Sequence, residues 1–361
     1  MNDLYVGIMS GTSLDGADAV LIDWESRKTL GFTSNQFSPD LRADLLSLCA
    51  SGNDELVRAA QAASRLARVY AQTVEQLLAQ TSIDRSDVKA IGCHGQTVRH
   101  HPELGFTIQL QNPALLAELT RIAVVADFRS RDVAAGGQGA PLAPAFHRGA
   151  FQSTHRNRAV INIGGISNVT VLPREGRALG FDCGPGNVLM NGWIERHQGL
   201  DFDRDGTWAS GGSVIPELLS QCLADDYFEL PPPKSTGRER FNLAWLDTKI
   251  RPGQSLRDVQ ATLLELTASS ISSALMRHFG ECDEIFLCGG GAHNRALVAR
   301  LKTLLPRTSI DTTDALGVPA QQVEAAAFSW LAKHAIEHKP IDLCNITGAR
   351  QPSILGAIYP A

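Results

Sequence analysis

The seven cysteines of the sequence form no C-x-x-C pair and follow no regular spacing. An odd, unpatterned set argues against a zinc site and a disulfide framework, and it is typical of reduced thiols in the cytoplasm. No uninterrupted apolar run reaches about 20 residues, the length that a membrane-spanning helix needs. Residues 1–11 contain neither the basic start nor the long apolar stretch of a secretory signal. The sequence therefore predicts a cytoplasmic protein without a membrane span.

Positive charge is also scarce. The chain has 33 Lys and Arg residues against 38 Asp and Glu residues, which gives a net charge of −5. Such a charge creates no attraction for nucleic acid or anionic lipid, so we expect neither as a partner. What the sequence does have is 43% hydrophobic and 20% charged residues over 361 positions. This composition and length are typical of a globular protein of two domains.

Residues 6–22 have the pattern of a strand, a polar turn and a second strand. The apolar positions are β-branched and suit a buried hairpin: Val6, Ile8, Val20 and Ile22. The turn, residues 10–16, holds more glycine and hydroxyl groups than a two-residue turn needs. Glycine lets backbone N–H groups approach an anion closely, and the hydroxyls add donors. We interpret the turn as a phosphate cradle, with an ordinary hairpin and an extended loop as the alternative.

The second half of the chain repeats this pattern. Residues 159–172 are again strand, glycine-rich turn and strand, and residues 163–168 echo residues 8–13. A triple glycine, residues 289–291, then joins a strand to a helix that begins near Arg295, which suits a nucleotide. Two phosphate-type hairpins predict a duplicated α/β fold of two lobes, each with a mixed five-stranded sheet and with a nucleotide in the cleft between them.

The lobe boundaries are placed by composition. Residues 134–141 are rich in glycine and are interpreted as a hinge or a crossover between lobes. We expect one lobe at residues 1–130 plus 341–361, and the other at residues 131–340.

Polar side chains follow two predicted strands. His94 and Thr97 come after a strand at residues 88–93, and Asp127 and Arg129 follow a strand that ends at Ala126. The carboxyl ends of strands in an open α/β sheet face the ligand crevice. We favour a hydrogen-bonded structural histidine for His94, with a residue of the ligand crevice as the alternative, and we interpret Thr97 as a ligand contact. Asp127 and Arg129 can bind sugar hydroxyls and an acyl oxygen, or they can pair with each other.

Two further carboxylates are candidates. Asp182 follows a short strand that ends at Phe181, and a Gly-Pro-Gly break separates it from a helix over residues 188–197. We favour a catalytic base there, with a turn residue or a helix cap as the alternative. Glu324 lies on a helix predicted over residues 319–334, where a ligand contact and a solvated side chain are equally compatible with the pattern.

Five motifs together carry a resemblance over nearly the whole chain: MSGTSLDG, GCHGQT, INIGGISN, FDCGPGN and CGGGAHN. The arrangement resembles the superfamily of actin, hexokinase and heat-shock chaperone ATPases. The five motifs are similar, more narrowly, to those of the anhydro-N-acetylmuramic acid kinases. The resemblance implies a two-lobed actin-like ATPase fold, related to ribonuclease H, and an enzyme that uses ATP and Mg²⁺ on a small-molecule amino sugar. It leaves open whether the chain forms a homodimer.

The resemblance also implies site residues. The family's catalytic base falls on Asp182. Its ATP site covers glycine-rich positions in both halves: Gly11, Thr12, Ser13, Leu14, Asp15, Gly16, Gly164, Gly165, Asn168, Gly289, Gly290 and Gly291. Its sugar site falls on Ser13, Thr97, Asp127, Arg129, Asp182 and Glu324.

One position departs from the superfamily, where an Asp begins the first phosphate motif and helps to hold Mg²⁺ through water. Here that position is Met9, so that Asp15 or Asp182 has to supply the carboxylate and the metal ligands are not assigned.

The implied reaction is unusual because the anhydro sugar has no free O6. Water, deprotonated by Asp182, would attack the anomeric carbon while O6 takes the γ-phosphoryl group of ATP. The product would be N-acetylmuramic acid 6-phosphate, an intermediate of cell-wall peptidoglycan recycling. Two alternatives remain: an ordinary sugar or carboxylate kinase of the same superfamily, and a regulatory actin-like ATPase.

Overall fold

A computed structural model describes residues 3–11 and 14–361. The chain divides into two compact units: Met1–Phe146 with Gln322–Ala361, and His147–Gln321. The boundaries differ from those expected, because residues 131–146 and 322–340 belong to the first unit rather than to the second. The glycine-rich segment 134–141 therefore lies inside the first unit and is not the crossover.

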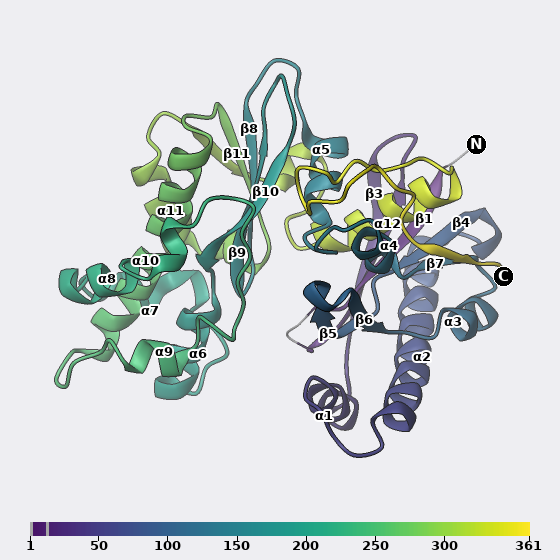
Figure 1. Cartoon of the computed structure of the whole chain (residues 1–361), viewed down its shortest axis with the longest axis horizontal. Coiled ribbons are helices and arrows are strands. Elements are labelled where there is room, and N and C mark those ends of the chain that lie inside the picture. The colour runs from purple at the N-terminus through teal and green to yellow at the C-terminus, as the bar shows by residue number, and fades with distance from the viewer. Residues whose placement is uncertain (1–2, 12–13) are drawn as a thin grey trace. The chain divides into compact units, whose positions relative to one another are not determined.

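The first unit is built on a six-stranded sheet in the order β13-β7-β4-β1-β2-β3. Figure 1 labels β1, β3, β4 and β7 of this sheet. Neighbours of β1 are antiparallel β2 and parallel β4, while β3 and β13 are antiparallel edge strands. The strands are β1 (Leu4–Met9), β2 (Gly16–Asp23), β3 (Lys28–Gln36), β4 (Val88–Cys93), β7 (Val124–Ala126) and β13 (Ala357–Tyr359). A separate antiparallel ladder joins β5 (Gln96–His101) to β6 (Phe106–Leu110).

Helices cover both faces of this sheet. They are α1 (Pro39–Leu48), α2 (Glu55–Thr81), α3 (Pro113–Thr120), α4 (Phe128–Ala134), α5 (Ala143–Phe151), which continues into the second unit, and α12 (Val323–Ile336). Side chains alternate along β1, so that Val6 and Ile8 pack with Tyr70 of α2. Tyr5, on the opposite face, packs with Phe328 of α12. Ser38 caps α1 by accepting a hydrogen bond from the Leu41 amide, at 3.3 Å.

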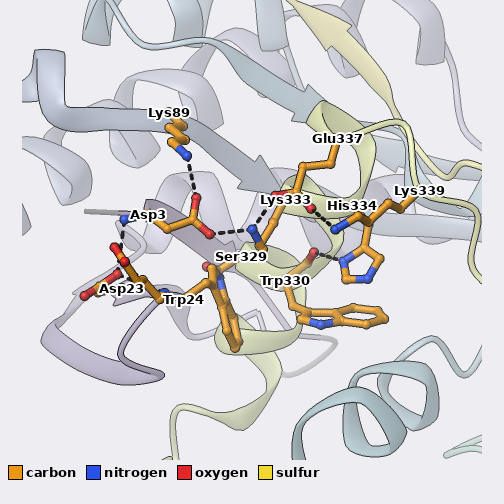
Figure 2. Close-up of polar contacts among 11 residues, drawn as sticks. Asp3, Asp23, Trp24, Lys89, Ser329, Trp330, Lys333, His334, Glu337 and Lys339 are labelled. Carbon is orange, nitrogen blue, oxygen red and sulfur yellow. Dashed lines mark hydrogen bonds and ion pairs between the residues drawn. The ribbon is translucent and has the colours of Figure 1, made fainter. Parts of the chain in front are cut away.

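Helix α12 lies directly on the sheet because two strands offer glycine beneath it. A Cβ on Gly7 would lie 1.9 Å from the carbonyl oxygen of Ala325, and one on Gly92 would lie 2.0 Å from that of Phe328. Near its C-terminal end, α12 is held by an ion pair between Lys333 and Asp3, which lies just before β1 (Figure 2). Asp3 also accepts a hydrogen bond of 2.6 Å from Lys89 of β4. The helix is therefore held in place along its whole length.

The second unit has a five-stranded sheet in the order β10-β9-β8-β11-β12. Its strands are β8 (Arg158–Ile163), β9 (Ile166–Leu172), β10 (Leu179–Pro185), β11 (Glu284–Cys288) and β12 (Ser309–Thr312). Three strands are antiparallel and the last two run parallel to β8, as in the first unit. The duplicated fold is thus confirmed. The expectation of five strands holds for the second sheet, whereas β13 adds a sixth to the first.

The helices of the second unit are α6 (Val188–Gln198), α7 (Thr207–Ser210), α8 (Pro216–Leu223), α9 (Leu243–Asp247), α10 (Leu256–His278) and α11 (Arg295–Leu304). Short 3₁₀ helices occur in both units: η1 (Arg85–Asp87), η2 (Pro102–Leu104), η3 (Arg204–Gly206), η4 (Asp226–Glu229), η5 (Gly290–His293) and η6 (Thr313–Leu316). Among the described residues, no helix combines the length and the apolar character needed to cross a membrane.

Candidate functional site

The turn after β1 is fastened by buried polar groups. The hydroxyl of Ser10 donates to the carbonyl oxygen of Gly95 at 2.9 Å and lies 2.7 Å from the hydroxyl of Tyr70. The carbonyl oxygen of Gly11 accepts a hydrogen bond of 3.0 Å from the side chain of Gln96. Residues of the GCHGQT segment therefore hold the start of the turn in place. The predicted ligand contacts Thr12 and Ser13 lie outside the described residues.

The end of the turn leads into β2. Leu14 has the left-handed φ of 60°, and Asp15 is exposed with its carboxylate 3.3 Å from Arg42. A Cβ on Gly16 would lie 2.3 Å from the carbonyl oxygen of Asn35, so this glycine is required by the fold as well.

A carboxylate that the sequence analysis missed stands across from Met9. Asp18 of β2 is the direct partner of Met9 in the β1–β2 ladder, and facing residues project to the same side of a sheet. Burial raises the pKa of Asp18, against a hydrogen bond from Ser34 that lowers it. The missed signal was register: residues 9 and 18 face each other across the turn.

Among the described residues, four predicted sugar contacts belong to the first unit. Thr97 lies on β5, where its hydroxyl accepts a hydrogen bond of 3.2 Å from Gln109. Asp127 directly follows β7 with a left-handed φ of 58° and an exposed side chain that makes no capping bond.

Arg129 is half-buried, and it lies close enough to Glu324 for the carboxylate to raise the pKa of the guanidinium. Burial has the larger effect and lowers the pKa of Arg129 to about 10. Arg129 donates to His94 and to the carbonyl oxygen of Gly139. The structure therefore brings Arg129 and Glu324 together. No ion pair between Asp127 and Arg129 is present among the described residues, contrary to that alternative.

In the second unit, the turn between β8 and β9 presents open glycine. The carbonyl oxygen of Gly164 accepts a hydrogen bond of 2.8 Å from the amide of Asn187, and that of Gly165 accepts one of 2.9 Å from the amide of Gly186. A Cβ on Gly164 or Gly165 would meet no described atom closer than 3.5 Å. This leaves room beside the backbone for a ligand.

Asp182 lies inside β10, whereas the sequence analysis placed it at the tip of a strand. It pairs with Asn168 of β9, and the register shifts between Asp182 and Gly184, which makes Cys183 an extra residue in the strand. Such a bulge redirects neighbouring side chains. Asp182 is therefore neither a turn residue nor a cap of α6.

The carboxylate of Asp182 is held by the loop that follows η4. One oxygen, Oδ2, accepts a hydrogen bond of 3.0 Å from the amide of Thr236, and the amide of Asp182 donates to Lys234 at 3.1 Å. Tyr227 donates to the carbonyl oxygen of Asp182 at 2.8 Å. Burial raises the pKa of Asp182 to about 6, while the Thr236 amide lowers it, Glu239 raises it and Lys234 lowers it. The sequence analysis missed this loop, because nothing in its composition marks it as a partner of β10.

The three glycines after β11 have different surroundings. Gly289 has the left-handed φ of 78°, and a Cβ on Gly291 would lie 2.3 Å from Ile163. Gly290 has open space, since its Cβ would come no closer than 3.8 Å to a described atom. It borders a cavity of about 450 Å³ that is lined by Asn187, Met190, Asn191, Phe202, Asp203, Arg204, Asp205, His293, Asn294 and Gln321 as well. Of the triple glycine, only Gly290 faces this cavity.

The two sheets share the order of five strands, and each has a glycine-rich turn after its first strand, which makes a duplicated α/β fold. The sequence matches the family model of anhydro-N-acetylmuramic acid kinase over residues 3–361. The chain belongs to the anhydro-N-acetylmuramic acid kinase family.

Two sequence relatives agree with this assignment. Anhydro-N-acetylmuramic acid kinase of Pseudomonas paraeruginosa is 53% identical over 362 residues, and that of Nitrosomonas europaea is 53% identical over 361, each match covering 99% of both chains. Among solved structures, an activator of a 2-hydroxyisocaproyl-CoA dehydratase from Clostridium difficile aligns over 93% of this chain and 96% of its own, at 14% identity and a TM-score of 0.49.

Proposed function

We propose that this chain is an ATP-dependent kinase that opens the 1,6-anhydro ring of 1,6-anhydro-N-acetylmuramic acid and phosphorylates O6. The product is N-acetylmuramic acid 6-phosphate, formed in the recycling of cell-wall peptidoglycan. Membership of the family supports the activity. The observation that carries it is Asp182, whose carboxylate is held by the Thr236 amide at 3.0 Å and whose pKa is raised by burial to about 6, so that it can accept a proton near neutral pH.

Asp182 acts on water. Its Oδ2 is occupied by the Thr236 amide, and no hydrogen bond to Oδ1 is present among the described residues, so Oδ1 is the basic atom. Asp182 takes a proton from a water molecule as the water oxygen bonds to the anomeric carbon. The bond from that carbon to O6 breaks, and O6 bonds to the γ-phosphorus as ADP leaves. One carboxylate thus performs the base step of an inverting glycosidase, while the phosphoryl group captures the departing oxygen.

The first unit supplies the contacts to the sugar. Arg129 offers a cation for the carboxylate and carbonyl oxygens of the substrate, and Glu324 beside it accepts from hydroxyls. Thr97, Asp127 and Ser13 add polar groups to the same set. Positioning of the sugar by such groups contributes to rate as well as to affinity.

ATP is assigned to the glycine-rich segments. We assign the phosphates to residues 11–16, of which Thr12 and Ser13 lie outside the described residues, and to Gly164, Gly165 and Asn168 of the second turn. The backbone beside Gly164 and Gly165 leaves space that a Cβ would fill, and this space supports the assignment. Gly290 lies on the cavity of about 450 Å³, which we assign to the nucleoside, with Gly289 and Gly291 shaping the backbone around it.

Mg²⁺ in such kinases neutralises the phosphate oxygens and keeps several waters. Among the described residues, no group of three or more potential ligands could hold a metal by itself. The residues present fit an ion that is held mainly by phosphate and water, with Asp18, across from Met9, as the carboxylate that accepts hydrogen bonds from its waters. Asp182 is a further candidate, and Asp15 contacts Arg42 instead.

A single turnover in ¹⁸O-labelled water tests the proposal. Quenched quickly and analysed by mass spectrometry, the product should carry the label on the anomeric carbon and none in the phosphate ester. Label in released inorganic phosphate alone would indicate plain ATP hydrolysis. A phosphorylated sugar with the anhydro bridge intact would indicate an ordinary kinase that uses another hydroxyl. Either result would overturn the proposal.

A further inference from the structure

His94 lies between the phosphate turn and the arginine of the proposed sugar site. It directly follows β4, and its side chain is 5% exposed. Its Nδ1 is 3.1 Å from the carbonyl oxygen of Ser10, the residue that leads into the turn. Its Nε2 is 3.2 Å from Nε of Arg129 and 2.9 Å from a terminal guanidinium nitrogen. Both ring nitrogens are therefore engaged.

The partners fix the state of the ring. A guanidinium has only donors and a carbonyl oxygen only accepts, so Nε2 must accept and Nδ1 must carry the proton. Burial and, after it, the charge of Arg129 lower the pKa of His94 to about 3, against backbone hydrogen bonds at Ser10 and Gly95 that raise it. The imidazole is therefore neutral, with one defined tautomer.

Arg129 is also held from its other side. It donates to the carbonyl oxygen of Gly139 at 2.8 Å, and the amide of Gly139 donates to Asp132 at 2.7 Å. Asp132 is buried and accepts a further hydrogen bond of 2.8 Å from the hydroxyl of Thr347. The acceptor for Arg129 is thus itself anchored in the core of the first unit.

Helix α12 adds the last contact. The ring of Phe328 lies 4.7 Å from that of His94, between centroids. Glu324 is four residues earlier, on the same face of the helix, which brings it to the neighbourhood of Arg129. One helix face therefore covers the imidazole and presents the carboxylate.

We propose that His94 is a positioning residue that sets the guanidinium of Arg129 for the sugar and ties it to the backbone of the phosphate turn. The identity of the sugar rests on the proposed function, but the hydrogen-bonded arrangement does not. His94 is not expected to touch the sugar or ATP. Its removal should loosen Arg129 and affect sugar binding more than binding of ATP.

The test compares His94→Phe, which keeps a ring but neither hydrogen bond, with His94→Gln, which keeps a donor and an acceptor. His94→Phe should raise the KM for the anhydro sugar about ten- to hundredfold, the range for losing a hydrogen bond to a charged group. The KM for ATP should change much less, and His94→Gln should restore part of the loss. The control is His147→Phe, since His147 is also buried and its Nδ1 lies 2.8 Å from a threonine hydroxyl, in the second unit.

An unchanged sugar KM in folded His94→Phe, with a lower melting temperature like that of His147→Phe, would show a purely structural role and overturn the proposal. A second readout does not depend on turnover. In ¹⁵N-histidine-labelled protein at pH 7, His94 should show a protonated Nδ1 and an unprotonated Nε2 whose signal moves in Arg129→Met. The opposite tautomer would overturn the positioning role. Absence of turnover on the anhydro sugar would instead remove only the proposed function.

Discussion

The glycines of the two units differ in their surroundings, although the two sheets share one strand order. Gly7 and Gly92 of the first unit lie against the backbone of α12, where any side chain would clash. At Gly164 and Gly290 of the second unit, a Cβ would meet no described atom closer than 3.5 Å, so a side chain would not clash. The first pair is required by packing, and the second leaves room for a ligand. A glycine-rich motif can therefore serve the fold or the site, and only its neighbours distinguish the two.

The chemistry also differs between the units. In the first, Arg129 and Glu324 bring charged groups of opposite sign together near the end of the sheet. In the second, one carboxylate, Asp182, is raised in pKa by burial and held by a loop. The first arrangement suits binding of a polar ligand, and the second suits proton transfer. The following predictions test this division of roles.

The largest effect is expected for the base. Asp182→Asn keeps the shape and the hydrogen bond from Thr236 but cannot accept a proton, so turnover should fall by about 10²–10⁴-fold. Asp127→Asn in the first unit is the matched control, and it should alter the KM for the sugar more than kcat. Steady-state kinetics measure both. If Asp182→Asn kept more than about a tenth of wild-type turnover, the base would have to lie elsewhere.

Two neighbouring glycines, Gly290 and Gly291, distinguish a packing role from a ligand-binding role. Gly290→Val should weaken ATP binding by about tenfold or more, because the side chain enters the cavity, while the melting temperature stays close to that of the wild type. Gly291→Ala should lower the melting temperature, because its Cβ would lie 2.3 Å from Ile163. Nucleotide titration and thermal melts measure the two effects. Unchanged ATP affinity in folded Gly290→Val would remove this turn from the site.

The carboxylate across from Met9 gives a smaller expected effect. Asp18→Asn should raise the Mg²⁺ concentration needed for half-maximal turnover by several-fold, since it removes an acceptor for metal-bound water. Titration of Mg²⁺ against nucleotide-bound protein by calorimetry should show the same shift without turnover. Asp15→Asn is the control, because its carboxylate contacts Arg42 at the surface. Equal Mg²⁺ requirements in the wild type and Asp18→Asn would exclude Asp18.

The smallest effect is a shift in pH dependence. Activity should fall below a pH of about 6, where Asp182 becomes protonated. Lys234→Met removes a positive charge that lowers the pKa of Asp182, so the acidic limb should move to higher pH. A limb that stayed in place would separate Lys234 from the base.

The same pKa has a consequence for stability. Because the folded pKa of about 6 lies above the ordinary value of 3.8, the folded state binds the proton more tightly than the unfolded state. The contribution of Asp182 to stability should therefore rise as the pH falls from about 6 towards 4. Asp182→Asn should lose this pH dependence, which melts across that range can measure.

The sequence predicted the elements that hydrophobic periodicity and turn residues determine. The strand at residues 88–93 is β4 without a change of bounds, and the repeated glycine-rich hairpins do mark two equivalent sheets. What it could not predict depends on partners far along the chain. The bulge at Asp182 requires the register of β9 against β10, and the role of Asp18 requires that of β1 against β2. The bounds of the first unit could be predicted only with the knowledge that α12 packs against β1.

That return of α12 has a consequence for synthesis of the protein. The second unit is an uninterrupted stretch, His147–Gln321, whereas the first is completed only by residues after Gln321. Domains fold as units as they leave the ribosome, in the order in which they are complete. The second unit therefore finishes first, while β1 and β4 still lack the helix that covers Gly7 and Gly92. The first sheet therefore lacks α12 on one face for the time needed to translate the whole second unit, and apolar surface exposed in this interval favours aggregation.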